Sequence, residues 1–107
     1  MATRKNANRE LKRYWLSYDL GLRGSYDSLY EWLDDKAAKE CGDSLATFRS
    51  NMTTEEIRRE LLDVLGEGSK ARIYLCSQSG GSFLLGKRKA APWAGYSQVT
   101  TENAMDQ

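Results

Sequence analysis

Residues 13–20 read RYWLSYDL, and this stretch decides the fold of the chain. Aromatic and aliphatic side chains fill most of it, and Gly21 and Gly24 bound it on the C-terminal side. A short apolar run that ends at turn residues is typical of a buried strand. We therefore predict the first strand here, with the carboxylate of Asp19 near its end beside a glycine-flanked loop.

The residues after this loop predict a helix. Ser25 stands at an N-cap position, where a hydroxyl group can accept a hydrogen bond from the first turn. Apolar residues then recur at helical spacing and form one stripe that is expected to face a core. The stripe consists of Tyr26, Leu29, Tyr30, Leu33 and Ala37, and Trp32 lies on its flank.

A hairpin and a second helix follow. Gly42 can reverse the chain before a strand that we predict at 44–49. Thr53 and Glu56 have the spacing of a capping box, which predicts that a helix begins at this point. Gly66 is a natural left-handed end for that helix.

Two further apolar segments complete the fold. Residues 71–76 alternate between apolar side chains and a more polar set that includes Arg72 and Tyr74. This alternation predicts a strand with one solvent-facing side. Residues 77–82 contain two glycines and predict a loop. The run Phe83–Leu85 is short and apolar, so it can pair at the edge of a sheet.

The order strand, helix, two strands, helix, strand predicts an α+β fold of the ferredoxin-like, split βαβ kind with a short C-terminal strand. In that fold an antiparallel sheet carries both helices on one face. We predict the domain at 13–97, between a flexible basic arm at 1–12 and a disordered tail at 98–107. The other face of the sheet needs a partner, either a nucleic acid or a second copy. The side chains expected on it are Trp15, Tyr74, Trp93 and Tyr96.

The composition limits the possible functions. The 107 residues include 16 basic and 15 acidic side chains, and this net charge of +1 is far from that of proteins that wrap duplex nucleic acid. The chain has no histidine, which excludes Ser-His and Cys-His nucleophile schemes. Cys41 and Cys76 are too few for a disulfide framework or a thiolate metal site. No signal-peptide or membrane-spanning stretch is visible, so we expect a cytoplasmic protein that does not enter a membrane.

Nucleic-acid binding therefore requires local basic patches. One cluster lies at 4–13, and another, at 87–89, follows the late apolar run. The alternative for both clusters is a solvated role that only keeps the chain soluble. The candidate nucleic-acid-binding residues are Arg13, Arg23, Lys87, Arg88 and Lys89.

Asp19 is the candidate catalytic and metal-binding residue. A magnesium ion takes only one or two protein carboxylates, so a twofold dimer that joins two Asp19 side chains could hold one. The metal would activate water and neutralise a scissile phosphate without any histidine. The alternative is that Asp19 caps the turn into Gly21 or the helix that follows.

Two motifs resemble those of a known family. The first is YWLSYDL at 14–20, an apolar strand that ends in a Tyr-Asp pair. The second is DSLATFRSNMTTEEIRREL at 43–61, in which a strand of the pattern Ser-apolar-X-X-Phe leads into a Thr-X-Glu-Glu helix start. Together they resemble the small CRISPR-associated spacer-acquisition family called Cas-two and its CRISPR-independent relatives, such as the VapD proteins. The resemblance covers residues 13–76, with a weaker echo at 91–96.

The resemblance implies a ferredoxin-like homodimer in which the two Asp19 side chains face each other and can hold a divalent metal. It also implies that C-terminal strands dock on the partner's sheet, a role for Phe83–Leu85 or for the Trp93–Tyr96 segment. The dimer-interface residues expected on these grounds are Trp15, Tyr74, Phe83, Leu84, Leu85, Trp93 and Tyr96. The chain departs from the family pattern after the Tyr-Asp pair, where Arg23 alone replaces an arginine-rich stretch.

Members of that family include metal-dependent endonucleases, noncatalytic scaffolds beside an integrase, and, among the VapD proteins, toxins with ribonuclease activity. Our leading hypothesis is a homodimeric nucleic-acid-associated protein. The sequence leaves open both magnesium-dependent cleavage of RNA or DNA and an integrase-type protein partner. The competing hypothesis is a noncatalytic dimeric interaction or scaffold module whose charge clusters only keep it soluble. A phage or plasmid regulator is a third, weaker hypothesis.

Overall fold

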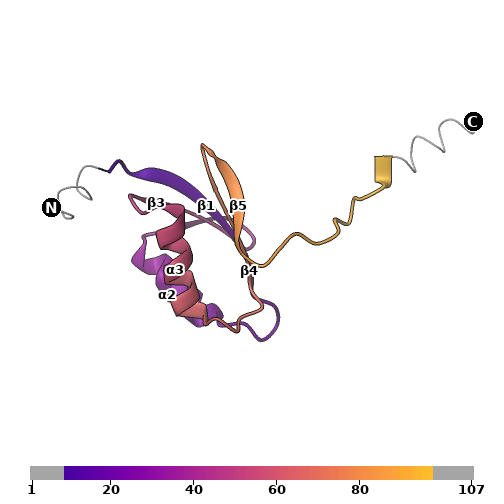
Figure 1. Ribbon diagram of the computed structural model, residues 1–107, viewed down its shortest axis with the longest axis horizontal. Coiled ribbons are helices and arrows are strands. Elements are labelled where there is room, and N and C mark those ends of the chain that lie inside the picture. Colours follow the sequence, from indigo (N-terminus) through magenta and orange to yellow (C-terminus); the bar gives the residue numbers. More distant parts are fainter. Residues whose placement is uncertain (1–8, 98–107) are drawn as a thin grey trace, which may run out of the picture.

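A computed structural model of the chain describes residues 9–97, which form an α+β fold (Figure 1). The strands are β1 (Lys12–Asp19), β2 (Lys39–Gly42), β3 (Leu45–Ser50), β4 (Arg72–Ser77) and β5 (Gly80–Leu85), and the helices are α2 (Tyr26–Asp35) and α3 (Thr54–Leu65). The strands form one sheet in the order β2-β3-β1-β4-β5, and each neighbouring pair is antiparallel. The first strand predicted from the sequence is therefore the central one.

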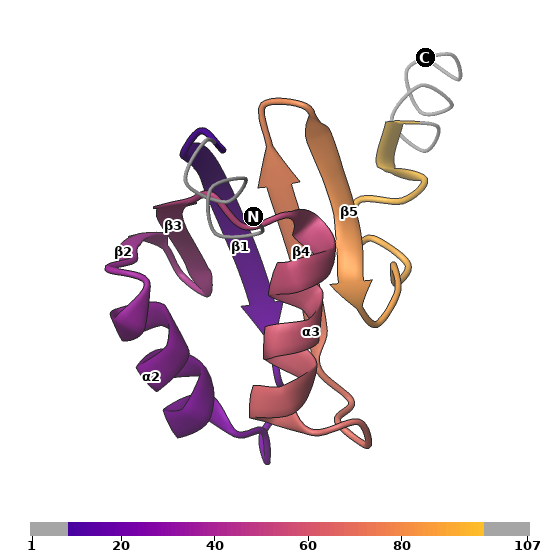
Figure 2. The same ribbon diagram turned by 60° about the vertical axis from the view of Figure 1, so that its left-hand side comes forward.

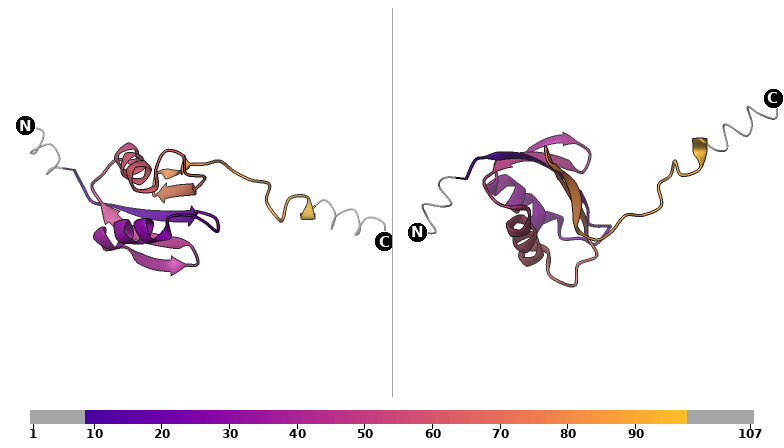
Figure 3. Two further views of the ribbon diagram at one scale, coloured as in Figure 1. Left: turned by 90° about the horizontal axis from the view of Figure 1, so that it is seen from below. Right: turned by 45° about the horizontal axis from the view of Figure 1, so that its top comes forward.

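Both helices cover the same face of the sheet (Figures 2 and 3). Along β1, Tyr14 and Leu16 are buried beneath them, while Arg13 and Ser17 alternate onto the opposite face and are exposed. The other core side chains come from both helices and from β3, β4 and β5. They include Leu29, Trp32 and Leu33, Ile57 and Leu61, Ala46 and Phe48, and Ile73, Leu75 and Leu84. The face opposite the helices, which we call the open face, is left without a covering layer within residues 9–97.

Helix α2 is rotated relative to the predicted stripe. Its buried residues are Leu29, Trp32 and Leu33, whereas Tyr30 is half exposed. The reason is the contact of Trp32 with the core, since its ring meets Phe48 edge to face at 5.5 Å and its indole nitrogen donates to Glu60 at 2.8 Å. The expectation that Tyr30 packs inward and Trp32 lies on the flank is therefore wrong.

The predicted start and end of the second helix are confirmed. The Thr53 side chain accepts a hydrogen bond from the Glu56 amide at 3.2 Å, and the Glu56 carboxylate accepts one from the Thr53 amide at 2.8 Å. Gly66 ends α3 with a φ of 86°, a conformation that glycine adopts without steric cost. Arg9 also binds Glu56, at 2.9 Å, which ties the residues before β1 to the N-terminus of α3.

The chain differs from the predicted fold at its last hairpin. Residues 77–82 do not form a loop, because β4 continues to Ser77 and β5 already begins at Gly80. The Tyr74 ring lies against Gly81 across the hairpin, where a Cβ atom would come within 2.6 Å of the Tyr74 hydroxyl oxygen. This packing replaces the missing side chain of a strand glycine and extends the pairing toward the turn. The α+β class is confirmed, and the sheet is broadly compatible with a ferredoxin-like fold to which β5 adds a fifth strand.

The ends of the chain lie partly outside the described residues. Most of the predicted arm and the whole predicted tail at 98–107 fall there, whereas β1 already begins at Lys12. Within residues 9–97, neither helix is long and apolar enough to cross a membrane.

Candidate nucleic-acid interface

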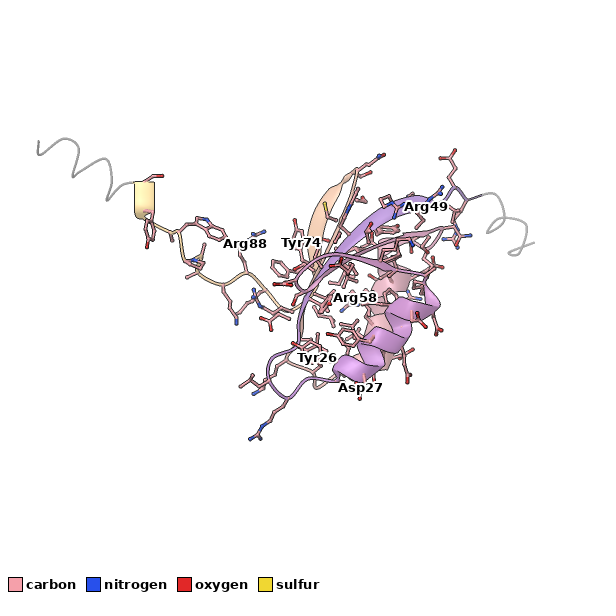
Figure 4. The ribbon with its side chains drawn as sticks, turned by 180° about the vertical axis from the view of Figure 1, so that it is seen from behind. Tyr26, Asp27, Arg49, Arg58, Tyr74 and Arg88 are labelled. Atoms are coloured by element: carbon pink, nitrogen blue, oxygen red, sulfur yellow. The ribbon has the colours of Figure 1, made fainter. Side chains whose placement is uncertain are left out.

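The open face carries one row of side chains from each strand. Strand pairing places Asp19 opposite Arg72, Ser17 opposite Tyr74, and Arg13 opposite Arg49. The row on β1 is about 20 Å long, since Arg13 and Asp19 are six residues apart at about 3.3 Å per residue. Figure 4 shows Arg49 toward one end of the sheet, and Tyr74 and Arg88 toward the other. The open face is therefore cationic at both ends.

Asp19 forms two hydrogen bonds at its end of this face. Its Oδ1 atom accepts from the Gly21 amide at 3.1 Å, and its Oδ2 atom accepts from Arg72 Nη2 at 3.4 Å. The Gly21 amide, followed by Arg72, holds the pKa of the Asp19 carboxyl below its ordinary value. Asp19 is thus an ionised group that caps the turn after β1, which agrees with the plainer of its two interpretations from the sequence.

Cations gather around this single carboxylate. Two adjoining hollows, of about 220 and 320 Å³, share Asp19, Arg72 and Arg88 in their linings. Lys70, Lys87 and Lys89 also line the larger hollow. The Arg72 Nε atom is buried and has no hydrogen-bond partner among residues 9–97, so Asp19 satisfies the guanidinium group only in part. We call Lys70, Arg72, Lys87, Arg88 and Lys89 the cationic end of the open face. Its positive charges exceed the single negative charge at its centre, which favours an anionic ligand.

The same geometry does not fit a magnesium ion within one chain. Both oxygens of Asp19 already accept hydrogen bonds, and the groups that surround the carboxylate are ammonium and guanidinium groups that repel a cation. Among residues 9–97, no three acidic or cysteine side chains gather where they could hold a metal. The magnesium site shared by two Asp19 side chains of a dimer stays a prediction from the sequence.

Two aromatic side chains lie beside the cationic end. The Tyr74 and Phe83 rings meet nearly edge to face, with centroids 5.0 Å apart and planes at 75°. The guanidinium carbon of Arg88 lies 5.5 Å from the Phe83 ring centroid. Both rings line the smaller hollow together with Ser17. Aromatic and cationic groups therefore share one depression on the open face.

Arg13 and Arg49 form a like-charged pair at the other end of the face. They stand directly opposite each other on β1 and β3, and both are exposed. Arg13 donates to the Thr47 hydroxyl at 3.3 Å, which holds its guanidinium over the sheet. Directly opposed like charges destabilise a strand pair. An anion bound between the two arginines would remove that cost.

The structure separates the predicted site residues into groups. Lys87, Arg88 and Lys89 join Asp19 at the cationic end, Arg13 lies at the far end, and Arg23 is exposed in the loop after β1. Of the residues predicted at a dimer interface, Trp15, Tyr74 and Phe83 lie on the open face, and Trp93 and Tyr96 are exposed in the segment after β5. Leu84 is instead a core residue, 6% exposed and on the helix side of β5, and Leu85 packs against the core.

Sequence reasoning missed three cations as site residues, Arg49, Lys70 and Arg72. The alternation at 72–76 already placed Arg72 on the same side as Tyr74, so it could have been found once that side was known to be open. Arg49 could be assigned to the site only from the register of β1 against β3, and no local sequence pattern predicts that register.

Comparison with known protein families finds no family model that matches the chain, and comparisons with curated proteins and with solved structures find no match either. What the protein does is therefore inferred from the side chains described above.

Proposed function

We propose that the protein binds nucleic acid, and that the phosphate backbone lies on the open face. The observation that carries this proposal is the convergence of five cations, Lys70, Arg72, Lys87, Arg88 and Lys89, around Asp19. Phosphate oxygens are good partners for lysine and arginine side chains that are presented in this way. The resemblance to the Cas-two family and the ferredoxin-like arrangement of the sheet support the same assignment.

The distribution of charge also supports this proposal, although the net charge is small. Helix α2 carries four acidic residues and no basic one, and α3 carries four acidic residues against two basic ones. These helices cover the face opposite the open face, so the acidic groups lie mostly on one side of the protein and the cations described above on the other. A polyanion would therefore approach the sheet and be repelled by the helices.

Phosphodiester cleavage is not part of the proposal. Asp19 caps a turn and pairs with Arg72, and its surroundings suit a phosphate better than a metal ion. Binding in which the phosphates contact Arg72, Lys87 and Lys89 requires neither a metal nor a general base.

The proposal includes a homodimer, but one that forms through the segment after β5 and leaves Trp15, Tyr74 and Phe83 on the open face free for the ligand. Trp93 is 74% exposed and Tyr96 is 68% exposed, and both belong to the segment after β5 that runs away from the sheet (Figure 3). Large exposed aromatic side chains support packing against a second copy. Sedimentation equilibrium tests this part separately, and a strict monomer at high concentration would contradict it.

The test of binding is a titration of a fluorescent oligonucleotide, followed by anisotropy. The variant K87Q/K89Q removes two charges from the cationic end, and the matched control R58Q/R59Q removes two charges from α3, where both arginines pair with exposed Glu55. We expect weaker binding for the first variant, by a similar factor for different sequences, and unchanged binding for the control. Equal effects of the two variants, or no binding by the wild-type protein, would contradict the proposal.

A further inference from the structure

The aromatic pair Tyr74 and Phe83 is not needed to hold phosphates, yet it lies inside the proposed binding face. Both rings are partly exposed, and they form the apolar wall of the hollow of about 220 Å³. The other lining residues, Ser17, Asp19, Arg72 and Arg88, are polar or charged. An apolar wall that is rimmed by cations matches a ligand with one flat apolar part next to negative charges.

A nucleobase with its flanking phosphates is such a ligand. Bases stack on aromatic rings and on the planar guanidinium group of arginine, and Arg88 already lies over Phe83 at 5.5 Å. The Ser17 hydroxyl and the Asp19 carboxylate line the same hollow and can accept hydrogen bonds from the N–H groups of a base. Arg72 and Arg88 belong to both hollows, so a base and a phosphate that follow each other along one strand can occupy them together.

We propose that this hollow is a subsite for one unstacked base of a single-stranded nucleic acid. The inference rests on the proposed function, because the cationic end must hold the flanking phosphates. A duplex keeps the faces of its bases inside its own stack, so it can use the cations but not the aromatic wall. The preferred ligand is therefore a single strand.

Gly81 fixes the orientation of the wall. The hydroxyl oxygen and two ring carbons of Tyr74 lie within 2.8 Å of the place where a Gly81 Cβ atom would be, so an added methyl group must displace the ring. No left-handed backbone conformation is required at Gly81, so alanine is compatible with the strand itself. Gly81 is thus a positioning residue, and G81A moves the wall without removing it.

The first test compares two probes that carry the same number of phosphates, a fluorescent oligodeoxythymidine and an abasic oligomer of the same length. We expect the wild-type protein to bind the abasic probe roughly 5- to 150-fold more weakly, the range for the loss of one base–aromatic stack. Equal binding of both probes would overturn the base subsite and leave the proposed function intact. No binding of either probe would overturn the proposed function itself.

The second test uses variants on the same two probes and on a duplex. Y74L and G81A should reduce the preference for the oligodeoxythymidine over the abasic probe, measured as the ratio of the two dissociation constants, and should not create a preference for either single-stranded probe over the duplex. The matched control Y30L alters an exposed tyrosine of α2 and should preserve the preference. If circular dichroism shows that Y74L does not fold, the preference of G81A for the oligodeoxythymidine decides whether the base subsite exists. A preference that persists in folded Y74L, or in G81A when Y74L does not fold, would overturn the inference.

Discussion

Asp19 and Arg72 stand directly opposite each other on β1 and β4, and their side chains join at 3.4 Å on the open face. This contact changes the role that we assign to the Asp19 carboxylate at the end of β1. A lone acid at a strand end suggests a metal ligand, but an acid that is held by a backbone amide and an arginine is a capping group. Asp19 then orients Arg72, and the arginine offers its remaining donors to a ligand.

The variant D19N tests that role. Asparagine can still accept the hydrogen bond from Gly21, while it removes the negative charge among the cations. We expect unchanged or tighter binding of an oligonucleotide, and a loss of stability of no more than about 1 kcal/mol because the ion pair is exposed. Anisotropy titration and urea unfolding measure the two effects.

The same variant also decides the question of cleavage. If the wild-type protein cleaves RNA or DNA in magnesium and D19N does not, Asp19 has a catalytic role that our account denies it. If neither protein cleaves RNA or DNA in magnesium, the result agrees with binding alone, and equal cleavage by both proteins would contradict it.

The variant R49Q should change stability and binding in opposite directions. Removal of one charge from the Arg13–Arg49 pair relieves the repulsion across β1 and β3, so we expect a gain in the free energy of unfolding of no more than about 1 kcal/mol, the size of an interaction between two exposed charges. Binding of an oligonucleotide should weaken, because one cation of the open face is lost. The control R49K keeps the charge and should show neither change. A loss of stability in R49Q would mean that the pair is not repulsive in the free protein.

Glu56 should make the stability of the protein depend on pH. The hydrogen bond from Arg9, followed by that from the Thr53 amide, lowers the pKa of the Glu56 carboxyl to about 2 from its ordinary value of 4.5. A lowered pKa stabilises the fold above the ordinary value, and this contribution is lost as the pH falls from about 4.5 through about 2. The Tm of E56Q should therefore be lower than that of the wild-type protein above pH 5, and the difference should shrink toward pH 2. A difference that is constant over this range would contradict the assignment.

The sequence predicted those parts of the fold that depend on local chemistry. The capping box of Thr53 and Glu56, the end of α3 at Gly66 and the alternation at 71–76 each follow from neighbours along the chain. The rotation of α2 does not, because Tyr30 and Trp32 are both apolar and only the contact of Trp32 with Phe48 and Glu60 decides which ring turns inward. The length of β5 was missed for a similar reason, since the Tyr74 ring compensates for the side chain that Gly81 lacks.

The candidate site was predicted only in part. Asp19 and the cations at 87–89 were found from their charge, and the structure places them together. Arg72 and Arg49 belong to the same face through strand pairing, so their roles depend on which strands are neighbours and in which register. Leu84 was assigned to an interface because the family resemblance implies that C-terminal strands dock on a partner's sheet, whereas Leu84 follows Phe83, lies on the helix side of β5 and is buried in the core.

The salt dependence of oligonucleotide binding tests the central claim most directly. For a single strand, the slope of log K against log salt concentration is about −0.7 per phosphate that is neutralised. We expect a steep negative slope for the wild-type protein, and a slope for K87Q/K89Q that is shallower by about 1.4, because two contacts are lost. R58Q/R59Q should keep the wild-type slope. A flat salt response of the wild-type protein, or the same slope in all three proteins, would show that the cationic end does not hold phosphates.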